Sequence, residues 1–169
     1  MAAYTGQITR SELAITLGNV SKLSNGNLGS IYIGIKAGET EVRPDNTVAA
    51  IAANASVINF KASGFVLGGG EAFPMGNGGF LTLGLAVGAM KGQYDASSMN
   101  SNSITTFKSD GVSFFSYGIG YLYSIYPGIN FSIDYKGQIY RYVYDSGLAN
   151  EYKLKEKLGG FGATLAVKF

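Results

Sequence analysis

The side chains that most often perform enzyme chemistry are missing from this chain. It contains no histidine and no cysteine, which removes the usual general base at neutral pH, the thiol nucleophile and the commonest zinc ligands. A Ser-Lys or carboxylate-only site would need neither, but no spacing of such residues points to one. The glycines Gly118 and Gly120 are not followed by the GK[ST] of a phosphate-binding loop. The sequence therefore predicts a protein that is not an enzyme and that uses no cofactor and no metal.

A first group of charged residues lies in the middle of segments, on the face where small residues alternate with large apolar ones. The group comprises Lys36, Lys61, Asp134 and Lys136. We expect these side chains to point into a confined interior, where a charge must be paired or hydrated. The sequence predicts a network centred on Asp134 with one or more of the lysines. We expect this network to plug the interior rather than to select ions.

A second group of charged residues lies just beyond the apolar part of three segments and shares the parity of the large apolar residues. We call it the cation belt: Lys91, Arg141, Lys153, Lys155 and Lys157. Cations that point outward at one height can bind the phosphates of lipopolysaccharide through charge-assisted hydrogen bonds. Solvated charges at strand ends would produce the same pattern and would carry little energy. Both interpretations stay open at this point.

Segments with a period of two position these residues. Large apolar residues recur at every second place within 13–17, 31–37, 58–62, 81–89, 115–125, 129–135 and 161–169. Such alternation indicates β-strands. The second face is mostly Gly, Ala, Ser and Thr, which suits the crowded interior of a narrow barrel better than a solvated exterior. We therefore expect an all-β fold, a transmembrane antiparallel up-and-down β-barrel whose large residues face lipid.

Composition agrees with a membrane barrel of one domain, residues 1–169. Charged residues make up 14% of the chain, whereas a soluble domain has about 25%. There is no run of about 18 apolar residues that could form a transmembrane helix. The net charge of +2 is too small to indicate a nucleic-acid partner.

Eight strands are expected, because barrels of single bacterial chains have an even number. The proposed strands are 11–22, 28–38, 46–53, 56–68, 79–91, 111–126, 128–143 and 152–169. The strand over 46–53 is the weakest, since its alanine-rich sequence could also form a short capped helix, and a break at Gly159-Gly160 is a second way to reach eight. Pro127-Gly128 predicts a tight turn on the periplasmic side. The Ser- and Asn-rich segment 92–110 predicts a long external loop.

The end of the chain carries a recognisable pattern. Phe161, Ala163, Leu165, Val167 and Phe169 alternate with smaller or polar residues, and the last of them is the final residue. This pattern resembles the C-terminal assembly signal of bacterial outer-membrane proteins. Length and strand number resemble the small barrels of the group that contains the OmpA transmembrane domain, OmpX, Ail, opacity-type and NspA-like proteins. The chain departs from that group in having no tryptophan and a weak third strand.

The resemblance implies a place and a role. It implies the bacterial outer membrane, recognition of Phe161, Leu165, Val167 and Phe169 by the barrel-assembly machinery, and contact with outer-membrane lipid and lipopolysaccharide. Outer-membrane enzymes on small barrels use a histidine, which this chain lacks. The expected function is structural or adhesive, exerted by a monomer through external loops and above all through 92–110. The alternative is a narrow channel or a carrier of small hydrophobic molecules. Met1-Ala2-Ala3-Tyr4 does not resemble a secretory signal, so a mature chain is expected.

Overall fold

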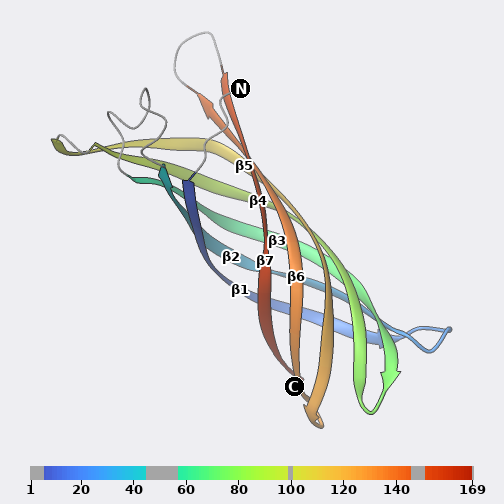
Figure 1. Cartoon of the computed structure of the whole chain (residues 1–169). Helices are drawn as coiled ribbons and strands as arrows, with labels where there is room; N and C mark the ends of the chain where they lie inside the picture. The colour runs from blue at the N-terminus through green and yellow to red at the C-terminus, as the bar shows by residue number, and fades with distance from the viewer. Residues whose placement is uncertain (1–5, 45–56, 99–100, 146–150, 169) are drawn as a thin grey trace.

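The computed structural model describes residues 6–44, 57–98, 101–145 and 151–168. These residues form one antiparallel sheet, with bounds β1 Gly6–Lys22, β2 Leu28–Pro44, β3 Val57–Gly76, β4 Gly79–Ser98, β5 Ser101–Tyr126, β6 Ile129–Asp145 and β7 Glu151–Val167. Each strand pairs with the next one along the chain, in the order β1-β2-β3-β4-β5-β6-β7. The sheet is strongly curled, so that its strands wrap around a common interior (Figure 1). The predicted all-β, up-and-down antiparallel fold is confirmed.

Three short turns lie at one end of the sheet. They join β1 to β2 at 23–27, β3 to β4 at Asn77 and Gly78, and β5 to β6 at Pro127-Gly128. Gly128 has φ +89°, the conformation that the third residue of a type II turn needs after proline. The predicted turn at Pro127-Gly128 is therefore confirmed. The register places the start of β1 at the opposite end, beside Pro44, and the end of β7 at the turn end, beside Ile129.

Large apolar side chains cover the outer face of the lower strands, towards the turn end. Most of the highly exposed residues have odd numbers, among them Leu17 at 71%, Phe65 at 68% and Phe161 at 84%. Tyrosines in the same half of β5 and β6 follow the same rule, since Tyr117 and Tyr135 are each about half exposed. A Cβ atom at Gly137 of β6 would lie only 2.3 Å from the ring of Tyr117, so the glycine leaves room for this ring.

The interior is packed only in the half away from the short turns. Its apolar cluster contains Ala62, Val66, Met90, Val112, Phe114, Tyr140 and Tyr142, all buried. The two tyrosines are completely buried. Below this cluster the inner face carries mainly small residues. The pattern of the strands therefore inverts along their length: large residues point outward near the turns and inward near the other end.

One prediction about the chain outline is wrong, and a second falls on residues that the structure does not describe. The expected loop 92–110 is mostly strand, because β4 and β5 continue as a long hairpin with Tyr94 paired to Phe107 and Gly92 paired to Ser109. Its β-branched and aromatic residues pair across the hairpin, which the high content of Ser and Asn concealed. The expected strand 46–53 lies outside the described residues. However, β2 pairs directly with β3 from Leu28↔Ala72 to Val42↔Ile58, so no strand lies between these two in the sheet.

Candidate functional site

The most connected polar group in the interior is the carboxylate of Glu12 on β1. Its Oε1 accepts hydrogen bonds from Lys36 Nζ and Gln138 Nε2, each at 2.8 Å. Its Oε2 accepts hydrogen bonds from Arg10 Nε at 3.1 Å and from Tyr140 OH at 3.3 Å. Glu12 therefore joins three strands, β1, β2 and β6, across the interior.

The cations around Glu12 have further partners. Arg10 Nη1 donates to Thr40 Oγ1 at 2.6 Å and lies 3.8 Å from Glu156 Oε2 on β7. Its guanidinium also lies 4.2 Å from the ring centroid of Tyr140, a cation–π distance. Lys36 Nζ lies 4.3 Å from the ring centroid of Phe114. Buried charges of this kind are tolerated because each has an opposite charge and a hydrogen bond.

We call Arg10, Glu12, Lys36, Gln138, Tyr140 and Glu156 the Glu12 cluster. The alternation of each strand places its members, since all six have even numbers and therefore share the inner face of the sheet. The cluster is a crosslink between the first two strands and the last two. It contains no activated nucleophile and no general base poised beside one, so its chemistry is to hold charge and to fill space.

The four predicted interior charges do not form one network. Lys36 is buried and belongs to the Glu12 cluster. Asp134 pairs with Lys136 of the same strand at 3.0 Å, lower in the interior. The ion pair of Asp134 with a lysine is as expected, but Asp134 is not the centre of the network, because Glu12 holds more of the partners.

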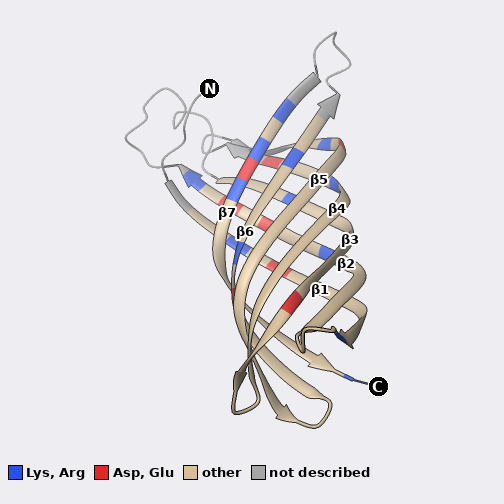
Figure 2. Ribbon diagram, turned by 90° about the vertical axis from the view of Figure 1, so that its right-hand side faces the viewer, with Lys and Arg blue, Asp and Glu red and all other residues tan. Residues whose placement is uncertain are grey.

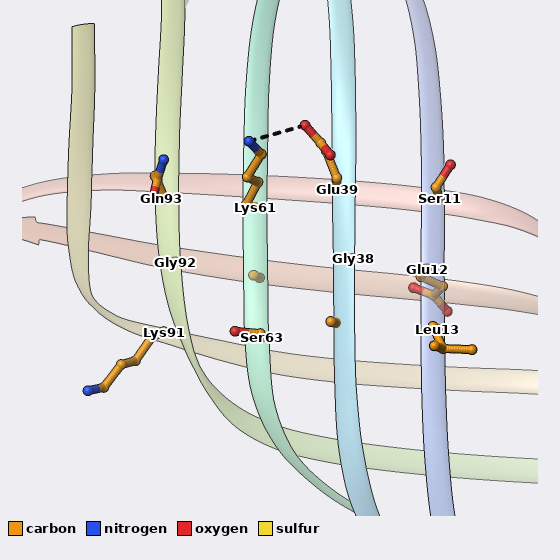
Figure 3. A pocket seen from close by; sticks show the side chains of 12 residues that line it. Ser11, Glu12, Leu13, Gly38, Glu39, Lys61, Ser63, Lys91, Gly92 and Gln93 are labelled. Carbon is orange, nitrogen blue, oxygen red and sulfur yellow. Dashed lines mark ion pairs between the residues drawn. The ribbon is translucent and has the colours of Figure 1, made fainter.

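Lys61 lies on the outer face, where the sequence placed it inside. Its Nζ lies 3.6 Å from Glu39 Oε1 and 3.2 Å from Asp95 Oδ2, and Figure 3 shows Lys61 turned towards Glu39 on the neighbouring strand. The even-numbered neighbours Ile58 and Ala62 are buried instead. The error arose because the apolar residues of β3 change face at this height, where the interior becomes apolar.

A hollow of about 700 Å³ on the outer face marks the change from apolar to charged rows (Figure 3). The register defines two rows across β1, β2, β3 and β4: Ser11, Glu39, Lys61 and Gln93 above, and Leu13, Ala37, Ser63 and Lys91 below. The small side chains of the lower row create the hollow. The next row down is the start of the apolar surface, with Ile15, Ile35, Phe65 and Ala89.

Asp95 fastens the β4–β5 hairpin to the outer face of β3. Its carboxylate accepts hydrogen bonds from Gln93, from Thr106 Oγ1 at 2.8 Å and from Lys61 at 3.2 Å. The hydrogen bond from Gln93, followed by those from Thr106 and Lys61, holds the pKa of the Asp95 carboxyl below its usual value of 3.8. On the inner face of β3 and β4, Tyr94 lies 5.2 Å from Phe60 between ring centroids.

Stability is expected to depend on pH through Asp95. Because its pKa is lower in the folded state, the stabilisation is fully present above the unfolded pKa of about 4 and is lost as the pH falls through the folded pKa. Replacing Asp95→Asn should reduce the free energy of unfolding by up to about 1 kcal/mol at neutral pH, and the difference should shrink below pH 4. Urea titrations of both proteins at pH 7, 5 and 3 measure this. A difference that stays constant over that range would contradict the role given to the Asp95 charge.

The structure places the members of the cation belt on the outer face. Lys91, Arg141, Lys153, Lys155 and Lys157 are all exposed. Arg141 pairs directly opposite Lys155, and Lys157 is opposite Ile139. Like charges that face each other across a strand pair repel, so an anion at this place would relieve the repulsion.

The residues of the expected assembly signal are exposed where they are described. Phe161, Leu165 and Val167 are 84%, 65% and 50% exposed on the outer face of β7, while Phe169 lies outside the described residues. Sequence reasoning did not find Arg10, Glu12, Gln138 or Glu156. Their even numbers place them on the inner face of the sheet, and this was the available signal. However, these residues flank the apolar stretches, where the alternation of apolar and small residues does not identify the inner face.

The comparisons leave the chain without a family assignment. A scan against protein-family models finds no match, and a search of curated proteins finds no relative. Among the described residues, no helix could cross a membrane. The same part of the chain has no group of three or more acidic side chains that could bind a metal ion.

Proposed function

We propose that this chain is a non-enzymatic integral protein of the bacterial outer membrane, in which the curled sheet spans the bilayer as a barrel. The observation that supports this proposal is the outer face of the strands in the half near the short turns. Large apolar residues at every second position are exposed on all seven strands, including Ile33 at 58%, Leu85 at 60% and Ile119 at 50%. An apolar surface that extends around a sheet would associate in water, whereas lipid satisfies it.

The distribution of charge supports the same proposal and suggests an orientation. Figure 2 shows that most charged residues lie on the half of the sheet away from the short turns, while the strands near the turns are almost free of them. Outer-membrane barrels have short turns in the periplasm and longer connections outside. The turns at 23–27, 77–78 and 127–128 then face the periplasm, and the charged half faces the exterior.

Closure into eight strands is part of the proposal. All neighbouring strands from β1 to β7 are already paired, so an eighth strand belongs between β1 and β7. Closure would satisfy the backbone groups of these two edges, which lipid cannot do. Each strand of 17 or more residues exceeds the 9–11 or so needed to span the bilayer.

The packed interior supports a structural role and not the channel or carrier that the sequence left open. The Glu12 cluster and the buried rings of Phe114, Tyr140 and Tyr142 occupy the upper interior. Barrels of this size are about wide enough for side chains to fill. We assign to the β4–β5 hairpin, which replaces the expected loop 92–110, the contact with an extracellular partner, because it extends furthest among strands of the charged half. The protein would contain one copy of this chain, assembled by the barrel-assembly machinery.

The cation belt is proposed to bind lipopolysaccharide phosphates. Replacing Lys91→Gln, Arg141→Gln and Lys157→Gln together should remove about 1 kcal/mol of lipid-dependent stability for each cation. The measurement is thermal unfolding in vesicles with and without lipopolysaccharide. A matched control is Lys22→Gln with Lys168→Gln, at the turn end, which should keep the full gain. An equal gain in the wild type and in the triple variant would refute the proposed contact.

A heat-modifiability gel tests membrane-barrel behaviour most simply. The chain is refolded into detergent micelles and run in SDS with and without boiling. Folded membrane barrels resist SDS until they are heated, so we expect two positions on the gel. A chain that folds in detergent-free buffer and shows one position would contradict the proposal.

A further inference from the structure

The sheet ends in two strands that face the same gap. Among the described residues, β1 has a sheet partner only on its β2 side and β7 only on its β6 side. Each of these edges presents a row of backbone N–H and C=O groups, a surface that readily pairs with another strand. We call the gap between them the seam.

The direction of the two edges determines what can fill the seam. Six antiparallel pairings separate β1 from β7, so the two strands run the same way. Direct pairing would therefore be parallel, unlike every other pair in the sheet. One strand that runs against both would make all pairings antiparallel.

Contacts inside the sheet indicate the width of the seam. The closest ion pair between the two edges joins the ends of two extended side chains, with Arg10 Nη1 3.8 Å from Glu156 Oε2. Extended arginine and glutamate side chains that meet at their tips span more than one strand spacing of about 4.8 Å, which agrees with β1 and β7 being unpaired in the sheet. Arg10 Nη2 and Glu156 Oε1 are buried there without a hydrogen-bond partner among the described residues.

Exposure shows that the seam is open towards the turn end. In β1 the inner-face residues Ala14, Thr16 and Gly18 are exposed, and in β7 so are Thr164 and Ala166. Inner residues of the central strands are buried at comparable or greater distance from the turns, as Val66, Phe114 and Ser116 show. The side chains next to the seam therefore lack a neighbour that the rest of the sheet has.

We propose that the seam is an acceptor site for one extended polypeptide strand that runs antiparallel to both β1 and β7. The inference rests on the proposed barrel and names the partner that completes it. The outward residues of this strand near the turns are large and apolar, beside Leu13, Ile15 and Phe161. Those at the other end are acidic, opposite the outward lysines of the upper β7, Lys153, Lys155 and Lys157. Its inner residues are small, with a polar group near Arg10.

The chain itself supplies a probe whose direction and outward residues meet these requirements. In the sheet, β2 (residues 28–44) runs in the direction opposite to β1 and β7. Its outward residues are Ile31, Ile33 and Ile35, followed by Glu39 and Glu41. The probe is a synthetic peptide with this sequence. Added to the refolded protein in micelles, it should bind at one copy per chain and slow hydrogen exchange of the edge amides of β1 and β7 at least tenfold. The peptide with Ile33→Pro and Ile35→Pro should give no protection, and Glu39→Lys with Glu41→Lys should weaken binding.

Introduced thiols test the seam without a peptide, because the chain has no cysteine of its own. Thr16→Cys is combined in turn with Gly162→Cys, Thr164→Cys and Ala166→Cys. We expect no disulfide in any of these proteins, since its Cα atoms must come within about 7 Å, but efficient coupling by a crosslinker of about 10 Å. A ready disulfide, edge amides protected as strongly as those of β4 without peptide, or a dimer closed through the two edges would each overturn the proposal. The gel described above reads membrane insertion separately, so a failed seam and a failed barrel are distinguishable.

Discussion

Replacing Glu12→Ala should lower the free energy of unfolding by about 1–3 kcal/mol, because Glu12 is partly exposed while its partners Arg10 and Lys36 are largely buried and would lose their counter-charge. The carboxylate accepts hydrogen bonds from Arg10, Lys36, Gln138 and Tyr140. Without it, two buried cations lose their counter-charge inside the sheet, and the contacts between β1 and β6 are broken. Denaturant unfolding of the refolded protein in micelles measures the change.

The matched control is Glu39→Ala, since Glu39 also pairs with a lysine but on the outer face. The Glu39–Lys61 pair is 3.6 Å long and both side chains are nearly half exposed, so its removal should cost less than about 1 kcal/mol. A second variant, Glu12→Gln, keeps the size and one acceptor and should cost less than Glu12→Ala. Equal small losses for Glu12→Ala and Glu39→Ala would show that the Glu12 cluster does not stabilise the fold.

Replacing Leu85→Arg should cost about 2–4 kcal/mol in lipid, the range for a cation at the bilayer midplane on the outer face of a barrel. Leu85 lies on β4, is 60% exposed and has Leu83 and Val87 on the same face. If this face contacted water, the same change would alter stability by no more than about 0.5 kcal/mol. Urea unfolding from lipid vesicles is the measurement.

The control for this charge is Thr9→Arg on β1. Thr9 is exposed on the same outer face but lies above the apolar rows, opposite Glu41. An arginine there should be neutral or slightly stabilising. A similar effect of Leu85→Arg and Thr9→Arg would contradict a lipid-facing surface at Leu85.

The fold follows from the sequence wherever a strand has one apolar and one small face. The alternation of 81–89 and 115–125 predicted both the strands and the outward direction of Leu83, Leu85 and Ile119, which are exposed as expected. Prediction failed where the two faces exchange character. In β3, the apolar residues Ile58 and Ala62 lie on the inner face, whereas Phe65 lies on the outer face. The apolar residues change face because the upper interior is apolar.

The candidate site was less predictable than the fold. Lys36 and Asp134 stand out because they interrupt runs of small residues, and both lie inside. Glu12 and Glu156 have polar neighbours along the chain, so nothing local separates them from surface charges. Their importance comes from strands β6 and β7, more than a hundred residues from β1, and only the curl of the sheet brings Gln138 and Tyr140 to Glu12.

The claim on which the function depends is that the odd-numbered face of the lower strands contacts lipid. Single cysteines at Leu83, Gly84, Leu85, Ala86 and Val87, each carrying a spin label in the vesicle-inserted protein, test this directly. We predict that labels at the odd positions collide frequently with oxygen and rarely with a water-soluble nickel chelate, and that labels at the two even positions are much less accessible to oxygen. Odd positions that collide with the nickel chelate as often as a label at Thr9 would place this face in water and contradict the proposed membrane barrel.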